Sequence, residues 1–173
     1  MDKTTLGDRM KGYEHVSKSK LMRRTPVIIR LDGKAFHTWT RWLKYSDPSL
    51  DTTPFSDIMH ETMSATAYDL VNTMQNAALT YTQSDEISIL LNDWKSIKSE
   101  QWFDGNVQKM VSISASMTTA FFNNKIQNCS PTPPLAYFDA RAFNVPMEEV
   151  ANYFVWRQQD ATRNSINMLG QAY

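Results

Sequence analysis

The sequence predicts an α+β fold of the ferredoxin-like type, an antiparallel sheet with its helices packed on one face. Three observations predict this class. The expected elements follow the order strand, helix, strand, strand, helix, strand and helix after an N-terminal helix. The two central strands are separated by a short polar turn, and 173 residues suit one domain of ordinary size. We therefore expect residues 1–173 to form a single domain, with the N-terminal helix, residues 1–24, docked onto it.

The first half of the chain supplies a strand between two helices. Residues 1–24 place apolar side chains among charged ones, which is typical of an amphipathic helix. Pro26 interrupts this pattern, and the apolar run after it predicts a short buried strand that ends at Asp32 and Gly33. Apolar residues then recur at helical spacing over residues 55–74, which predicts a helix whose methionines fill the core.

The second half begins with a predicted hairpin. Two apolar runs bracket the polar tetrad 83–86, and strand, tight turn, strand is the natural interpretation. A further helix, a proline-rich loop, a last strand and a last helix follow, the last helix starting near Pro146 with acidic residues in its first turn. The expected strands are 77–82, 87–91 and 135–143, and the expected helices are 99–124 and 146–173.

The composition excludes several classes of protein. Cys129 is the only cysteine, so the chain forms no intrachain disulfide. No apolar stretch approaches the roughly 20 residues that a membrane helix needs, and neither repeats nor low-complexity segments occur. We expect a cytoplasmic protein without membrane attachment.

Charge is spread unevenly along the chain. The net charge is zero, but the residues up to Lys44 include eleven Lys or Arg against four Asp or Glu, a net charge of +7. Such a segment suits contact with phosphates. A solvated basic face against the acidic remainder of the chain explains the asymmetry equally well, so both interpretations stay open.

Acidic residues meet at one edge of the predicted sheet. In this fold the first strand and the central hairpin are neighbours, so Asp32 at the strand end can approach Asp85 and Glu86 in the hairpin turn. Three carboxylates so close repel one another unless a cation binds or a pKa rises. Nucleotidyl transfer needs two divalent cations held by carboxylates, and magnesium takes oxygen ligands. The pattern indicates a metal site with these three acids as catalytic candidates.

Groups that bind phosphate surround the acids. Gly33 allows a close approach of the backbone to a ligand, and Arg30 and Lys34 supply positive charge. Each signal has an ordinary alternative, because an RLDG string also ends simple strands at a turn and an SDE string also forms solvated hairpin turns. The residues alone leave a metal site and an ordinary strand edge both open.

Four sequence blocks, in order, resemble the motifs of the tRNA-His guanylyltransferase family. They are residues 30–37 (RLDGKAFH), 81–86 (YTQSDE), 138–141 (FDAR) and 156–160 (WRQQD). The run 152–164 is most similar to the bacterial and phage-type members, the tRNA-His guanylyltransferase-like proteins. The resemblance implies a palm domain related to those of polymerases, working in the 3′-to-5′ direction.

The resemblance also implies roles for single residues. Asp32 and Asp85 would hold two Mg²⁺ ions, the carbonyl of Gly33 would add a ligand, and Glu86 would support the site. A nucleoside triphosphate would lie against the residues after the opening strand, the hairpin turn and one lysine further along the chain. The implied nucleotide-binding residues are Asp32, Gly33, Lys34, Ala35, Phe36, His37, Ser84, Asp85 and Lys109.

The implied partners are tRNA and the nucleoside triphosphates GTP and ATP. Family members activate an RNA 5′ end and join a nucleotide to it, generally as homotetramers, so we expect a homotetramer. Arg30 and Asn164 fall where RNA contact or 5′-end activation is expected. Residues 162–165 (TRNS) replace the HINN run of eukaryotic members, which favours templated 5′-end repair of tRNA over strict guanylate addition to tRNA-His.

Other functions and contacts stay open at this stage. A nucleotidyl cyclase or a 5′-to-3′ polymerase would use the same fold, and a nucleotide- or RNA-binding protein would need no turnover. Trp39 and Trp42 would either pack against the N-terminal helix or stack on RNA bases. Arg157 would either meet RNA or form a buried ion pair with Asp139 or Asp160.

Overall fold

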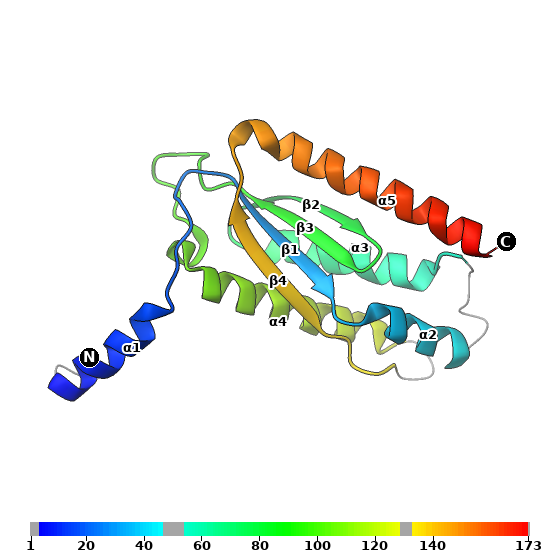
Figure 1. Ribbon diagram of the computed structural model, residues 1–173, viewed down its shortest axis with the longest axis horizontal. Helices are drawn as coiled ribbons and strands as arrows, with labels where there is room; N and C mark the ends of the chain where they lie inside the picture. Colours follow the sequence, from blue (N-terminus) through cyan, green and yellow to red (C-terminus); the bar gives the residue numbers. More distant parts are fainter. Residues whose placement is uncertain (1–3, 47–53, 129–132, 173) are drawn as a thin grey trace.

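A computed structural model describes residues 4–46, 54–128 and 133–172. Its helices and strands alternate in the predicted order, with one helix more than expected (Figure 1). The helices are α1 (Thr5–Val16), α2 (Phe36–Ser46), α3 (Asp57–Thr73), α4 (Val107–Ile126) and α5 (Val150–Ala172), with 3-10 turns η2 (Trp102–Gly105) and η3 (Met147–Glu149). The strands are β1 (Val27–Gly33), β2 (Ala77–Gln83), β3 (Glu86–Leu91) and β4 (Phe138–Asn144).

The four strands form one sheet in the order β2-β3-β1-β4 (Figure 1). All three neighbouring pairs are antiparallel, and β1 pairs with β3 and β4 along its length. The expected hairpin is present, with Ser84 and Asp85 as its two-residue turn. The predicted α+β, ferredoxin-like class is therefore confirmed. β1 lies inside the sheet, hydrogen-bonded to β3 along one edge and to β4 along the other.

One face of the sheet carries the apolar core. Alternate residues of β1, Ile29 and Leu31, pair with Ile89 and Ile87 of β3, and all four are fully buried. Helices α3 and α4 cover them with methionine, leucine and phenylalanine side chains, as the helical spacing of those residues predicts. Burial of this apolar surface is what holds the helices on the sheet.

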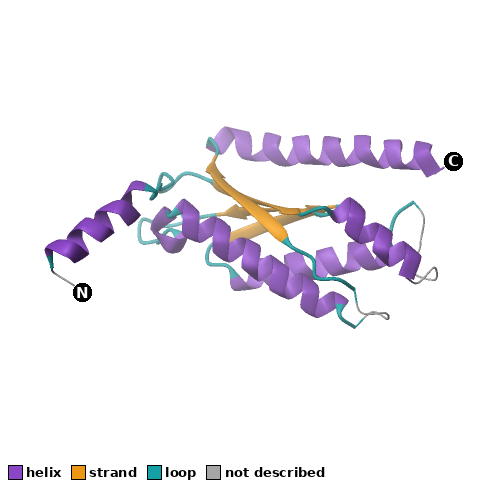
Figure 2. Ribbon diagram, turned by 60° about the horizontal axis from the view of Figure 1, so that its bottom comes forward, coloured by secondary structure: helices purple, strands orange, loops and turns teal. Residues whose placement is uncertain are grey.

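The opposite face is covered by α5, which differs from the expectation that all helices share one face. Figure 2 shows the helix that ends at the C-terminus on one side of the sheet and the other packed helices on the other side. The alternate residues Arg30 and Ser88 point to this side, where the Ser88 hydroxyl is 2.8 Å from the Tyr153 hydroxyl of α5. A polar face needs a cover that satisfies its hydrogen bonds, and α5 supplies one.

Helix α2 was not expected from the sequence. Its Phe36 and Trp39 stack at a centroid distance of 5.4 Å and meet Phe122 of α4 and Phe138 of β4. The indole N–H of Trp39 donates to the carbonyl of Pro134 at 2.8 Å. Trp39 thus packs in the domain core, and the expectation that it meets the N-terminal helix is wrong.

Helix α1 is also placed differently from the expectation. Within the described residues it has no buried side chain, and in Figure 1 it extends away from the sheet. Leu6, Met10, Tyr13 and Val16 are exposed along it, so the predicted docking of the N-terminal helix onto its own domain is wrong.

Among the described helices, none combines the length and the apolar character needed to cross a bilayer.

Candidate active site

The end of β1 places an acid between two other acids. Asp32 is the cross-strand partner of Glu86 on β3 and of Asp139 on β4. Directly opposed like charges destabilise a sheet. Such a row therefore marks a place where a cation or a nearby arginine must compensate.

The hairpin turn brings Asp85 to the same edge. Its backbone carbonyl accepts a hydrogen bond from the N–H of Gly33 at 3.1 Å, so the turn is tied to the residue that follows Asp32. Ser84 has a φ of 50°, a left-handed conformation that a two-residue hairpin turn requires. The predicted approach of the strand end to the hairpin turn is thus present as a direct backbone contact.

The pKa of Asp85 reflects its burial and its electrostatic repulsion from the carboxylate of Asp32. Burial raises the pKa of Asp85 above its ordinary value, and the negative charge of Asp32 raises that pKa further. Hydrogen bonds from its own backbone N–H and from Ser84 oppose the shift but do not cancel it. A bound cation would reverse this penalty, because it favours the charged form of both acids.

Glu86 is engaged differently from Asp32 and Asp85. It is 7% exposed and lies 2.8 Å from the Nε of Arg157 and 3.7 Å from the Nε of Arg30. Burial raises the pKa of Glu86, and the two arginines hold it below the value that burial alone would give. The carboxylate faces cations of the protein, so its role is to fix α5 and β1 beside the acids.

Arg157 links α5 to the sheet in a way that sequence reasoning only partly found. Its guanidinium donates to Asp160 at 2.8 Å, as one of the expected pairs, whereas the pair with Glu86 was missed and the pair with Asp139 is not formed. Arg157 also lies over the ring of Trp156 at 4.3 Å. The spacing of Tyr153, Arg157 and Asp160 by four and three residues was the available signal, since it places them on one helix face.

The chain turns from β1 into α2 through Gly33, Lys34 and Ala35. A Cβ at Gly33 would lie 2.3 Å from the ring of Phe36, so packing of the aromatic cluster requires glycine here. The N–H of Lys34 donates to the carbonyl of Tyr137 at 2.8 Å, and Ala35 has a φ of 56°. The turn therefore leads directly from Asp32 to the N-terminus of a helix, a place suited to an anion.

Two further predicted residues, His37 and Asn164, lie on exposed surfaces. His37 is in the first turn of α2 and its Nε2 is 2.6 Å from the Arg41 guanidinium. Asn164 is on α5, two turns beyond Arg157 and exposed at the end of the helix that passes the acids. His37 thus lies close to the edge of the sheet where β1 ends, four residues after Gly33.

Lys109 is not brought to this edge. It is exposed in the first turn of α4, where the Asn106 side chain caps the helix by accepting the Lys109 N–H at 3.0 Å. Phe122, near the other end of α4, is the residue that meets Phe36. Thirteen residues of helix, roughly 20 Å, separate Lys109 from Phe122, so within one chain Lys109 lies at the far end of α4 from the turn that follows Asp32.

The arrangement offers two carboxylates for a metal, not three. Within the part of the chain that the structure describes, no group of three or more His, Cys, Asp or Glu side chains could hold a metal ion. In that same part, neither Asp32 nor Asp85 forms an ion pair with Lys or Arg. These two acids, with the adjacent backbone carbonyls, are the oxygen ligands that remain for a divalent cation.

Comparison with known proteins places this site in context. The profile of a family described as tRNAHis guanylyltransferase matches residues 7–146. The tRNA(His) guanylyltransferase of Schizosaccharomyces pombe is 31% identical over 161 residues, which cover 91% of this chain and 56% of that protein. Protein R259 of Acanthamoeba polyphaga mimivirus is 29% identical, covering 93% of this chain and 60% of its own length. The chain thus spans a little over half the length of these relatives.

Solved structures agree with the sequence comparisons. A bacterial tRNA(His) guanylyltransferase-like protein in complex with GTP is 45% identical, with a TM-score of 0.90 over 98% of this chain and 77% of that chain. A bacterial protein of the same description in complex with ATP is 46% identical, with a TM-score of 0.90 over 97% of this chain and 71% of that one. The Saccharomyces cerevisiae tRNA(His) guanylyltransferase, at 22% identity and a TM-score of 0.67, shares the fold.

Proposed function

This chain belongs to the tRNAHis guanylyltransferase family, and on that premise we propose that it is a nucleotidyltransferase that adds nucleotides to the 5′ end of tRNA. One observation carries the proposal: Asp32 at the end of β1 and Asp85 in the hairpin turn lie at one edge, joined by the Gly33 to Asp85 backbone hydrogen bond. Templated repair of truncated tRNA 5′ ends is the activity that residues 162–165 favour.

The metal-binding role falls to Asp32, Asp85 and the carbonyl of Gly33. The fit of a hard cation rests on two carboxylates without an arginine or lysine partner in the described residues and on the burial, together with the charge of Asp32, that raises the pKa of Asp85. Two Mg²⁺ ions, when bound, would stabilise negative charge on the attacking and leaving oxygens of the transfer. Glu86 keeps α5 and Arg30 in place around these ligands.

The triphosphate of the nucleotide is proposed to lie along the turn from β1 into α2. The backbone N–H groups at the N-terminus of α2 and the side chain of Lys34 supply positive potential there, and Ser84 faces the same edge from the hairpin. Ala35, Phe36 and His37 line the start of the helix. GTP and ATP are the proposed nucleotides, because they are named in the complexes of the bacterial neighbours.

The RNA 5′ end is proposed to approach from the α5 side of the sheet. Arg30 lies on that face beside Glu86, and Asn164 is exposed further along α5.

We propose that the chain acts in the cytoplasm as a homotetramer. Light scattering at micromolar concentration tests the assembly, and a monomeric mass would contradict it.

Incubation with a labelled tRNA lacking its first nucleotide, Mg²⁺ and triphosphates tests the proposed activity. The wild-type protein is expected to lengthen the 5′ end, and Asp85→Ala is expected not to. Magnesium-dependent triphosphate binding without a lengthened product would instead identify a binding protein. A cyclic nucleotide formed from ATP or GTP without RNA would identify a cyclase.

A further inference from the structure

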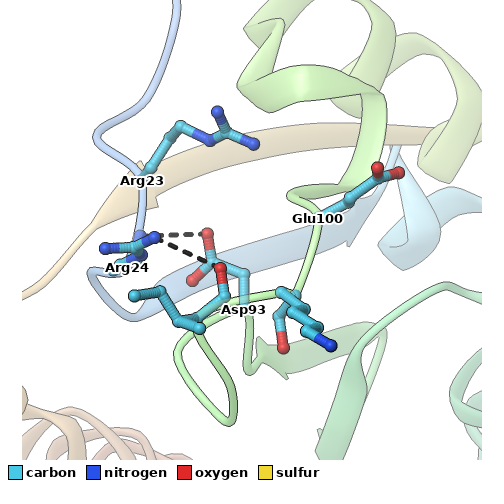
Figure 3. Close-up of a pocket in the computed structure, with 7 residues that line it drawn as sticks. Arg23, Arg24, Asp93 and Glu100 are labelled. Atoms are coloured by element: carbon cyan, nitrogen blue, oxygen red, sulfur yellow. Dashed lines mark hydrogen bonds between the residues drawn. The ribbon is translucent and has the colours of Figure 1, made fainter.

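A hollow lies at the other end of the sheet from the acids. It has a volume of about 500 Å³ and is lined by Arg23, Arg24, Asp93, Lys98 and Glu100 among others (Figure 3). The residues come from the segment before β1 and from the loop after β3. β1 has seven residues, so roughly 20 Å separate this hollow from the edge where Asp32 and Asp85 meet.

Asp93 gives this hollow a buried, unsatisfied acceptor. Its side chain is 3% exposed, and one carboxylate oxygen, Oδ2, accepts the backbone N–H of Arg24 at 3.1 Å. The other oxygen, Oδ1, has no hydrogen-bond partner. A buried carboxylate oxygen without a partner costs free energy, so a ligand that brings an O–H or N–H group would be favoured here.

Cationic side chains surround this acceptor. The Arg24 guanidinium donates to the Ile97 carbonyl at 3.2 Å, and its backbone has a φ of 58°, while Arg23 and Lys98 are exposed at the rim. Figure 3 shows Arg23, Arg24 and Glu100 arranged around Asp93. A ligand that fits must therefore carry both a hydrogen-bond donor and negative charge.

The neighbouring surface favours a phosphate that belongs to a nucleic-acid chain over a free phosphate. In the segment before β1, residues 18–24 hold Lys or Arg at four positions and no Asp or Glu, and one of the four, Lys20, pairs with Asp104. A second hollow of about 400 Å³ shares Arg23 and Glu100 with the first and includes Phe103, which is exposed enough to stack on a base. Cations, an aromatic ring and an acceptor for a hydroxyl group are the kinds of group that recognise a nucleotide of single-stranded RNA.

We propose that this hollow binds one nucleotide of the RNA substrate, at a site remote from the reacting 5′ end. The phosphate would meet Arg23 and Lys98, and the ribose 2′-hydroxyl would donate to Oδ1 of Asp93. A 2′-hydroxyl is the group that lets a protein distinguish RNA from DNA at a single position. The inference rests on the proposed function only in taking the polyanion to be RNA.

The salt dependence of tRNA binding, measured by fluorescence anisotropy without triphosphates, tests the phosphate contacts. Each phosphate contact contributes about 0.7–0.9 to the slope of log affinity against log salt. The double variant Arg23→Ala/Lys98→Ala is expected to lower this slope by about 1.5. The control Lys95→Ala removes the same kind of charge from the same loop without lining the hollow, and is expected to change the slope far less.

The assay reads binding alone, so it separates this proposal from the proposed activity. Asp85→Ala is expected to abolish 5′-end addition and to leave the slope unchanged. An unchanged slope in the double variant, or an equal change in Lys95→Ala, would overturn the phosphate contacts. A millimolar excess of GTP that abolishes the difference between wild type and double variant would assign the hollow to free nucleotide and overturn its assignment to RNA.

Asp93→Asn tests the hydroxyl contact. Asparagine keeps one oxygen for the Arg24 N–H, but the group that then faces the ligand is an NH2, which cannot accept a hydrogen bond from the ribose hydroxyl. The preference for RNA over a DNA of the same sequence is expected to fall about threefold to tenfold, at an unchanged melting temperature. An unchanged preference, or tighter RNA binding through the loss of negative charge, would show that Asp93 does not accept from the ribose.

Discussion

The two faces of the sheet are built from different chemistry although they share the same strands. Toward α3 and α4, β1 and β3 present Ile29, Leu31, Ile87 and Ile89, all fully buried. Toward α5, the intervening positions of the same strands include Arg30, Glu86 and Ser88. Because successive side chains of a strand point to opposite faces, each strand contributes to the apolar core on one side and to the polar contacts with α5 on the other.

This difference separates the parts of the molecule that stabilise the fold from those that carry the proposed reaction. The apolar face gains free energy from burial, whereas the polar face buries charges that are only compensated by one another. The two carboxylates without a protein cation lie where the polar face ends. Substitutions on the two faces should therefore have different consequences, which the following experiments test.

The largest expected effect comes from Asp85→Asn. Loss of a metal ligand should lower the rate of 5′-end addition by a factor of about 1,000, which corresponds to about 4 kcal/mol in the barrier. The free energy of unfolding should stay the same or rise, because burial and the charge of Asp32 disfavour the ionised carboxylate. Asp139→Asn, on the other side of Asp32, is the matched control. An equal loss of activity in that control would contradict the assignment.

On the apolar face, Ile89→Ala should instead lower stability and leave activity nearly unchanged. The residue is fully buried, so the cavity should cost about 2–5 kcal/mol in the free energy of unfolding, measured by urea denaturation. Activity per folded molecule should remain close to that of the wild type. A stable variant with lost activity would show that the two faces are not separable in this way.

Arg157→Met tests the buried charges that hold α5. Removing the arginine leaves Glu86 with Arg30 at 3.7 Å as its cation, and we expect a loss of about 3 kcal/mol in stability. The double variant Arg157→Met/Glu86→Gln removes both charges and should recover most of this loss. Failure of the double variant to recover would mean that packing of Arg157, over Trp156 for example, matters more than its charge.

The smallest effect concerns pH. Because the pKa of Asp85 is raised in the folded protein, the folded state binds more protons than the unfolded state between the ordinary value of 3.8 and the raised value. Without metal, this group therefore lowers stability as pH rises through that window. Mg²⁺ binding needs the ionised form, so metal affinity should instead increase with pH, by at most about tenfold per unit for one carboxylate. Urea denaturation without metal at several pH values checks the first sign, and calorimetric Mg²⁺ titrations check the second. Metal-free stability that rises with pH through this window, or metal affinity that falls, would contradict them.

Much of the sheet and the meeting of the acids could be predicted from sequence. Polar residues between two apolar runs located the hairpin, and the end of the apolar run from Val27 located Asp32. The same run also held the signal for a second covered face, because the three consecutive apolar residues Val27, Ile28 and Ile29 do not alternate with polar ones, which indicates a strand buried on both sides. That signal was available and would have placed a helix on each face.

Other features depend on contacts that sequence does not display. Helix α2 combines tryptophans and threonines, which have low helix propensity, and Phe36 and Trp39 hold it through Phe122 and Phe138. The pair of Arg157 with Glu86 joins residues 71 positions apart, and Lys109 lies at the far end of α4 from the turn beside which the family resemblance would place it. These outcomes follow from tertiary packing, which overrides local pattern.

The most direct test of the central claim is a crystal structure of the protein with Mn²⁺ in place of Mg²⁺ and GTP. Anomalous scattering locates the metal independently of the surrounding density. We expect Mn²⁺ within bonding distance of a carboxylate oxygen of Asp32 and one of Asp85, with Glu86 still held by Arg157. Metal bound only by phosphates, or by Asp139 in place of Asp85, would contradict the claim.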